Sequence, residues 1–210
     1  DKTFDIVYVS QKNENFSDPE RGIELCEKIF QKYACNIFII TRNVIPKKFH
    51  KRLVNLNETM RQYDKTLFVG SSVIGLESSK ISEDLCSIPS PTERIEFLKD
   101  IFKMNIHSLL LIRPLFPSKI IPSNEIEQLV NNISGCISCV VTGPLMVNDS
   151  ILKRLNLRQS DLEYIDGGES EYLNGAIKDS MKFVDVKNEM AHLKLYCSTN
   201  SSNVRYRHPV

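Results

Sequence analysis

One stretch of the sequence, residues 66–117, constrains the fold more than any other. Apolar runs of strand length occupy 66–71 and 108–113, and the first ends in a Gly-Ser-Ser turn. Between them, prolines mark a loop, Ser90 or Thr92 can cap a helix, and apolar residues recur at helical spacing. Two continuously apolar strands joined through a helix predict a parallel pair with a right-handed crossover.

The alternation of strand and helix extends along the first 157 residues. Strands are predicted near 4–9, 36–41, 66–71, 108–113 and 136–142. Asp18 followed by Pro19 predicts the start of the first helix, Pro46 opens a helix that runs to about Tyr63, and Ser123 is expected to cap a later one. This alternation indicates an α/β fold with a parallel sheet, either open and doubly wound or curved towards a barrel.

The pattern loosens beyond residue 157, which divides the chain into two predicted parts, 1–157 and 158–210. Residues 155–175 are polar and contain glycines, which is typical of a surface excursion. A short helix is expected to start at Asp149, a further helix around 171–182, and a last strand at 192–198. We therefore expect a C-terminal extension that follows the βα region.

Composition bears on the partners and the location that we expect, although a local basic patch is still possible. The chain has 210 residues and a net charge of +1 at pH 7, so no overall field draws it to nucleic acid or to a membrane. No apolar stretch approaches the roughly 18–20 residues of a membrane-spanning helix. The chain opens on charged residues without a leader and without a starting Met, and we expect it to be a piece of a longer protein. Six irregularly spaced cysteines, several within apolar runs, predict free thiols in the cytoplasm.

Polar residues at the carboxyl ends of the predicted strands are the candidate site residues, because both doubly wound sheets and barrels carry their working groups there. The side chains at these ends are Ser10, Gln11, Arg42, Ser71, Ser72 and Arg113. Each also has a structural explanation: Arg42 can be a surface cation, Arg113 can form a salt bridge, and the polar residues can bond their own turns.

Several sequence pieces, in order, resemble the radical S-adenosylmethionine superfamily, and most closely its spore photoproduct lyase-like branch. The pieces are IVYVSQ at 6–11, IITR at 39–42, GSSVI at 70–74, SPTERIEFLKDI at 90–101 and IRPLFP at 112–117. The resemblance covers roughly residues 4–145. It implies a partial (β/α)6-type, TIM-like barrel whose five strands match the family's second to sixth strands, with the first strand absent.

The resemblance implies that the strand ends bind S-adenosylmethionine. Arg42 stands where the family often has a basic residue for the methionine carboxylate. Ser72, with Ser71 as the alternative, resembles the hydroxyl that contacts the ribose. Ser10 and Gln11 stand near the expected position of the ligand's amino group, and Arg113 is expected to contact the ligand.

The sequence departs from the family at the iron–sulfur cluster. The family holds a [4Fe–4S] cluster on three cysteines, usually C-x-x-x-C-x-x-C, and this chain has no such triplet. Either the cluster segment lies outside this chain or the protein is a cluster-free relative. We favour the first explanation, because a native sheet that began at residues 4–9 would expose an apolar edge. The same edge would invite an oligomeric partner.

Three functions follow from these alternatives. With an upstream cluster segment, the protein would cleave S-adenosylmethionine to a deoxyadenosyl radical that acts on an unknown substrate. Without a cluster, it would be a binding or regulatory subunit. If the chain shares only the alternation of strands and helices with this superfamily, it is an unrelated α/β ligand-binding domain.

Two further motifs are discounted. Cys136 and Cys139 lack the second pair that a zinc site needs, and we interpret them as core thiols, so no metal site is predicted within the chain. The Gly-Gly-Glu at 167–169 matches a family motif in letters, but it lies far downstream of the expected strand.

Overall fold

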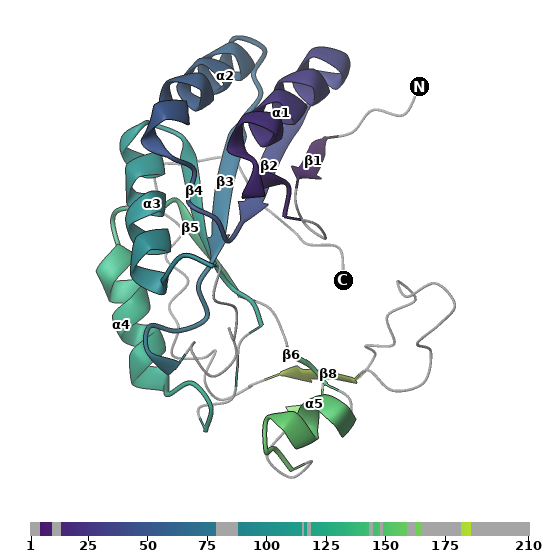
Figure 1. Cartoon of the computed structure of the whole chain (residues 1–210), viewed down its shortest axis with the longest axis vertical. Helices are drawn as coiled ribbons and strands as arrows, with labels where there is room; N and C mark the ends of the chain where they lie inside the picture. The colour runs from purple at the N-terminus through teal and green to yellow at the C-terminus, as the bar shows by residue number, and fades with distance from the viewer. Residues whose placement is uncertain are drawn as a thin grey trace.

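Five parallel strands form one sheet in the order in which they occur along the chain (Figure 1). The computed structural model describes residues 5–9, 14–78, 88–114, 116, 119–142, 145–147, 149–158, 163–164 and 182–185. The strands are β1 (Ile6–Val9), β2 (Asn36–Thr41), β3 (Leu67–Ser72), β4 (His107–Ile112) and β5 (Cys139–Thr142). The predicted strands are confirmed to within a few residues, except that Cys136 precedes β5 instead of belonging to it.

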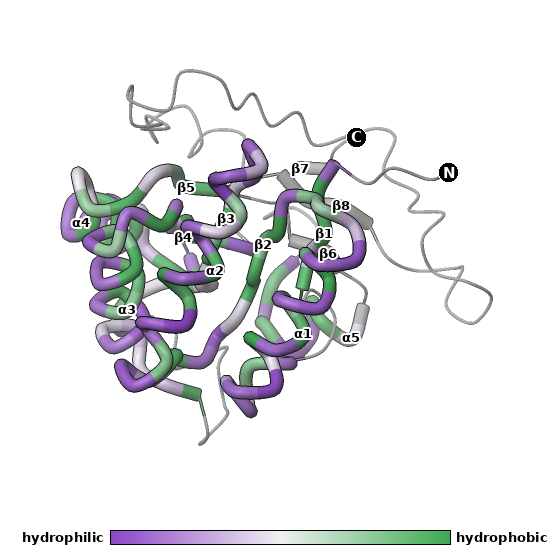
Figure 2. The backbone as a smooth tube through the Cα atoms, turned by 90° about the horizontal axis from the view of Figure 1, so that it is seen from above, coloured by the Kyte–Doolittle hydropathy of each residue, from purple (hydrophilic) through white to green (hydrophobic). Residues whose placement is uncertain are grey.

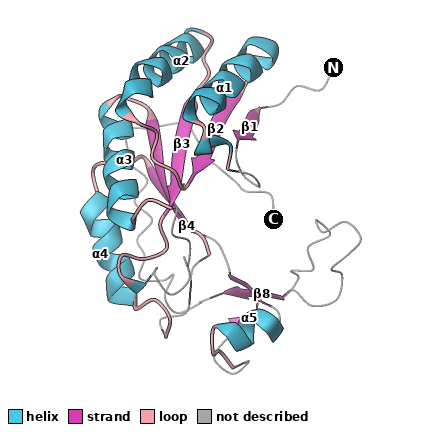
Figure 3. Ribbon diagram, viewed as in Figure 1, coloured by secondary structure: helices cyan, strands magenta, loops and turns pink. Residues whose placement is uncertain are grey.

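The helices that connect these strands lie on one side of the sheet (Figures 1 and 3). They are α1 (Pro19–Tyr33), α2 (His50–Gln62), α3 (Pro91–Lys103) and α4 (Ser123–Ile133), with 3-10 turns η1 (Asn15–Ser17) and η2 (Lys47–Phe49). Successive right-handed crossovers in one direction place every helix on the same face. A doubly wound sheet would carry helices on both faces, so the arrangement is that of a partial TIM-like barrel. Within the described ranges, no helix is long and apolar enough to cross a membrane.

The starts of α1 and α3 confirm the predicted capping signals. The Arg21 amide donates to Asp18 Oδ1 at 3.2 Å, and Pro19 opens α1. At α3, the Glu93 amide donates to Ser90 Oγ at 3.3 Å and the Ser90 amide donates to Glu93 Oε2 at 2.8 Å, which completes a capping box.

The predicted cap of α4 is wrong by one residue. Pro122 occupies the N-cap position, and Ser123 is the first residue of the helix. The side chain of proline accepts no hydrogen bond, so α4 begins without a side-chain cap. The sequence signal failed because the extended backbone of Pro122, with φ −59° and ψ 140°, already places the helix start at the next residue.

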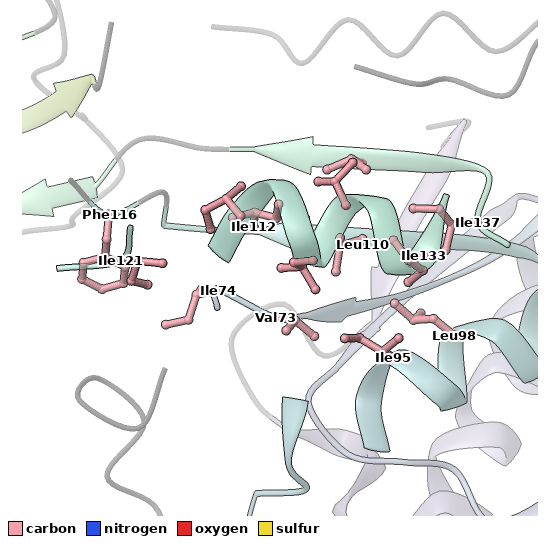
Figure 4. Close-up of a cluster of buried hydrophobic side chains, with 14 of the residues drawn as sticks. Val73, Ile74, Ile95, Leu98, Leu110, Ile112, Phe116, Ile121, Ile133 and Ile137 are labelled. Atoms are coloured by element: carbon pink, nitrogen blue, oxygen red, sulfur yellow. The ribbon is translucent and has the colours of Figure 1, made fainter. Parts of the chain in front are cut away.

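The face of the sheet under the helices forms the main core. Along each strand alternate side chains point to this face, so Leu110 and Ile112 of β4 pack with Ile95 and Leu98 of α3 (Figure 4). A second cluster joins β1, β2 and β3 to α1, α2 and α3 through residues such as Ile39. Hydrophobic and hydrophilic segments alternate along the helices, as expected when only one side of each helix is buried (Figure 2).

The other face of the sheet, here called the inner face, carries its own small apolar cluster. Its buried members are Phe38, Phe68, Leu109 and Leu111. An aromatic row crosses it from Tyr8 through Phe38 and Phe68 to His107, with ring centroids 5.5, 6.2 and 5.4 Å apart. Gly70 leaves room for two of these side chains, because a Cβ there would lie 2.5 Å from Leu111 Cδ1 and 2.8 Å from Phe38 Cε2.

A second, three-stranded antiparallel sheet was not predicted from the sequence. It has the order β6-β8-β7, formed by Leu145–Val147, Lys182–Asp185 and Glu163–Tyr164. Lys182 was expected at the end of a helix, but it begins β8. The described residues include neither the rest of that helix, expected at 171–182, nor the strand expected at 192–198. The short helix α5 (Asp149–Arg154) begins at the predicted residue.

Candidate functional site

The carboxyl ends of β2, β3 and β4 bring three of the predicted site residues to one edge of the sheet. Thr41 of β2 pairs with Ser71 of β3, so Arg42 and Ser72 are the next residues on these adjacent strands. The Ser72 hydroxyl donates to the carbonyl oxygen of Arg113 at 3.4 Å, which joins the ends of β3 and β4. Arg42 and Arg113 are exposed, and Ser72 is half-buried.

The two neighbouring serines lie on opposite faces of the sheet. Ser72 alternates with Gly70 and Phe68 on the inner face, whereas Ser71 alternates with Val69, which packs in the core under the helices. Ser71 is fully buried, and its Oγ has no hydrogen-bond partner among the described residues. A ligand on the inner face would therefore meet Ser72, and the ribose contact stays a prediction for that residue.

The structure describes the carboxyl end of β5 but not the residues that directly follow β1. Ser10 and Gln11 lie outside the described residues, so their part in the site stays a prediction. At the carboxyl end of β5, Thr142 pairs through its backbone with Ile112, and Leu145 begins β6.

Glu14 is a strand-end residue that sequence reasoning missed. Its Oε1 accepts the Thr41 hydroxyl at 2.7 Å and the Phe16 amide at 3.3 Å, and its Oε2 accepts the Arg42 amide at 3.0 Å. The Asn43 amide in turn donates to Thr41 Oγ1 at 2.9 Å. This carboxylate therefore fastens the segment after β1 to the end of β2 and holds the backbone of Arg42. An acidic residue in the polar loop after an apolar strand was the available signal.

Arg94 is the second residue whose role the sequence did not reveal. It is 0% exposed, and its Nη1 donates to the backbone oxygen of Ser72 at 2.6 Å. It lies on α3 one turn before Leu98, on the buried side of the helix. A cationic residue at a position that the helical period assigns to the core was the signal.

Glu125 of α4 is the third residue whose role was missed, and it fastens the loop after β3. It is buried, and its carboxylate accepts the Glu77 amide at 2.7 Å, the Ser78 amide at 3.0 Å and the Ser78 hydroxyl at 2.6 Å. Burial by itself would raise the pKa of this carboxyl, but the hydrogen bonds from the loop outweigh burial and lower the pKa. The carboxylate is therefore ionised at neutral pH and binds the loop to α4.

The described residues do not fit an iron–sulfur cluster. They contain no group of three or more His, Cys, Asp or Glu side chains that could hold a metal. The described cysteines are Cys26, Cys35, Cys136 and Cys139, all with free thiols. Burial raises the pKa of Cys26 to about 12, and metals bind the thiolate form, so this cysteine in particular is a poor ligand.

The strand-end edge combines groups that suit a polar ligand with a carboxylate and hydroxyl groups. The guanidinium groups of Arg42 and Arg113 can bind a carboxylate through paired hydrogen bonds. The Ser72 hydroxyl can both donate to and accept from a sugar hydroxyl. Glu14 holds the backbone of Arg42, Arg94 holds the backbone of Ser72, and Glu125 holds the loop that follows β3.

Comparisons with known proteins identify a similar fold among solved structures. A scan against family models and a search of curated proteins found no significant match. The chain is similar to a mutant spore photoproduct lyase with bound AdoMet and dinucleoside spore photoproduct, with a TM-score of 0.55 and 10% sequence identity. The similarity covers 90% of this chain and 55% of the lyase chain. SuiB of Streptococcus suis, bound to S-adenosylmethionine, matches with a TM-score of 0.46 and 14% identity, over 72% of this chain and 34% of SuiB.

The likeness to the lyase confirms the predicted fold. The chain has an α/β fold with a parallel five-stranded sheet that is similar to the fold of this lyase. At 10% identity the likeness concerns the fold alone, and the chain spans about half the length of the lyase that it matches.

Proposed function

We propose that this chain is an S-adenosylmethionine-binding domain of the radical S-adenosylmethionine type. The observation that carries the proposal is the grouping of Arg42, Ser72 and Arg113 at one carboxyl edge of a sheet with helices on a single face. A structure of similar fold, the spore photoproduct lyase, has AdoMet bound.

Each group at the edge has a proposed role. Arg42 would pair with the carboxylate of the methionine moiety, because a guanidinium group matches a carboxylate with two parallel hydrogen bonds. Ser72 would contact a ribose hydroxyl, and Arg113 would bind a further polar group of the ligand. Ser10 and Gln11 would complete the edge near the amino group. Glu14 would act indirectly, since it holds the Arg42 amide at 3.0 Å.

The chemistry that S-adenosylmethionine supplies in this family is a radical formed with the help of a [4Fe–4S] cluster. We assign no such step to the residues described here, because they include no ligand set for the cluster. The part proposed for this chain is to bind and orient the cofactor at the strand ends. A segment that carries the cluster would have to come from elsewhere in the protein or from a partner, and the substrate is not assigned.

Equilibrium dialysis of the purified chain with radiolabelled S-adenosylmethionine tests the proposal. We expect saturable binding, and Arg42→Ala should weaken it about tenfold, as the loss of a hydrogen bond to a charged group does. Arg61→Ala is the matched control, because Arg61 is an exposed arginine at the end of α2, away from the carboxyl ends of the strands. The proposal is wrong if the wild-type chain does not bind the cofactor, or if both arginine variants bind as the wild type does.

A cluster-free binding or regulatory subunit is the second candidate. Such a subunit would need no cluster ligands, and the described residues contain no group that could hold a cluster. Counting iron in the protein purified anaerobically from its own cells separates the two candidates. About four irons per protomer would support an enzyme with a [4Fe–4S] cluster. Cofactor binding without iron would support the binding subunit. The absence of both iron and cofactor binding would support an unrelated α/β ligand-binding domain.

A further inference from the structure

We infer that Arg94 is a positioning residue that holds the ligand-binding end of β3 in place. The inference rests on the proposed function, because it concerns the same edge of the sheet. Arg94 lies on α3, on the helix-covered side of the sheet, and its guanidinium group binds the backbone of Ser72. It therefore acts on the ligand site through another residue.

The burial of Arg94 calls for an explanation beyond packing. A charge removed from water is costly unless hydrogen bonds compensate, and an apolar side chain of similar volume is often the more stable choice at such a position. Arg94 is fully buried one turn before Leu98, in the core between α3 and the sheet. Its bond to Ser72 O is short, at 2.6 Å, as charge-assisted hydrogen bonds are. The bond to Ser72 O therefore offsets part of the cost of burying this charge, and it connects the charge to the end of β3.

The bond completes the hydrogen bonding of the backbone at the last residue of β3. The Val73 amide, next along the chain, donates to Leu111 O of β4 at 3.0 Å. The Ser72 carbonyl, which precedes that amide in the same peptide unit, accepts from Arg94. Both polar groups of this peptide unit are therefore held, one by the neighbouring strand and one by α3.

Holding this peptide unit restrains the backbone on the C-terminal side of Ser72, from which its side chain projects. Ser72 lies at the strand end with its side chain on the inner face, opposite to that of Ser71. Its own hydrogen bond, to Arg113 O, is long at 3.4 Å and can be exchanged for a ligand hydroxyl at little cost. The N-terminal end of α3 is also fixed, by the Ser90–Glu93 capping box, so Arg94 is held on a well-ordered first turn.

The test is a double-mutant cycle on the affinity for S-adenosylmethionine, measured by equilibrium dialysis on the full chain. We expect Arg94→Met to weaken binding about tenfold, as the loss of a charge-assisted hydrogen bond does. Arg94→Lys should lose less, because an ammonium group can still donate to Ser72 O. In a Ser72→Ala background, Arg94→Met should weaken binding by no more than about twofold, since residues that act through one contact are not additive.

Lys99→Met is the matched control. It removes a cation from the same helix at a partly buried position, where Lys99 forms a salt bridge with Glu96 rather than with β3. Its affinity should equal that of the wild type. A purely structural role for Arg94 predicts a lower unfolding temperature with unchanged affinity in folded protein. That result, or losses that multiply in the double variant, overturns the inference.

Hydrogen exchange keeps the inference testable if Arg94→Met does not fold. In Arg94→Lys, the Val73 amide should exchange faster than in the wild type, while amides in the middle of β2 and β4 should not change. Unchanged exchange at Val73 in a variant whose binding is weakened overturns the inference. If the wild-type chain does not bind S-adenosylmethionine, the proposed function is overturned as well. If the wild type and Arg94→Met bind it with equal affinity, only the role of Arg94 is overturned.

Discussion

The two faces of the five-stranded sheet are both apolar, yet they are buried in different ways. On the helix-covered face, strand residues such as Ile39 and Leu110 interlock with side chains from several helices. On the inner face, the cluster around Phe38 and Leu111 consists of strand residues from across the sheet. The helix-covered face provides most of the core, and the inner face borders the edge that carries Ser72. The comparison shows that one face holds the fold together while the other presents the proposed ligand site.

Truncation of a side chain on the helix-covered face should have the largest effect on stability. Leu98 is fully buried between α3 and the sheet, so Leu98→Ala should lower the free energy of unfolding by about 2–5 kcal/mol. Chemical denaturation monitored by circular dichroism measures the change. Leu25→Ala is the control, because Leu25 is 38% exposed and should change stability by less than about 0.5 kcal/mol. Equal effects of the two variants would contradict the assignment of the core.

An added methyl group on the inner face should have the next largest effect. Gly70→Ala would place a Cβ 2.5 Å from Leu111 Cδ1 and should cost about 1–3 kcal/mol of unfolding free energy through overpacking. The same denaturation experiment applies. If the clash with Leu111 is the cause, the double variant with Leu111→Ala should cost less than the sum of the two single changes. Additive losses would show that another strain is responsible.

The carboxylate that binds the loop after β3 should make a smaller, pH-dependent contribution. Because the folded pKa of Glu125 lies below its ordinary value of 4.5, its stabilisation is complete above pH 4.5 and is lost as the pH falls through the lower, folded pKa. Glu125→Gln should therefore cost about 1 kcal/mol at pH 7. The difference from the wild type should shrink in denaturation curves recorded below pH 4.5.

A neighbouring variant on the same helix provides the control for this pH dependence. Glu127 is exposed, so Glu127→Gln should change stability by less than about 0.5 kcal/mol at any pH. If the difference between wild type and Glu125→Gln stays constant down to pH 3, or grows there, the carboxylate does not bind the loop as the structure indicates.

The smallest effects on stability should come from substitutions of the two adjacent serines. Comparing these two variants is the most direct test of which face each serine side chain occupies. Ser71→Ala should be neutral within about 0.5 kcal/mol or slightly stabilising, because it removes a buried hydroxyl that has no hydrogen-bond partner among the described residues. Ser72→Ala should also be well tolerated but should weaken the binding of S-adenosylmethionine. A greater loss of affinity in Ser71→Ala than in Ser72→Ala would reverse the assignment of faces.

Local signals predicted much of the fold. Asp18 and Ser90 cap their helices as expected, since a cap depends on residues within one turn. The strands were found because each is apolar on both faces, and the edge that carries Arg42, Ser72 and Arg113 follows from parallel strands ending together. The prediction failed for the cap of α4, because Pro122 occupies the N-cap position. It also failed for the antiparallel sheet, because its strands are two to four residues long and far apart in the sequence.

The sequence by itself determined the βα alternation, the parallel direction of the strands and the set of polar residues at their ends. Apolarity on both faces, however, leaves the position of the helices open, and tertiary structure decided that all of them cover one face. It also decided that Ser71 and Ser72 point to different environments. The hydrogen bonds from Glu14 to the end of β2, from Arg94 to Ser72 and from Glu125 to Glu77 and Ser78 join residues 22 to 48 positions apart. Such contacts exist only after the chain packs, because no local pattern specifies which backbone group a buried charge will meet.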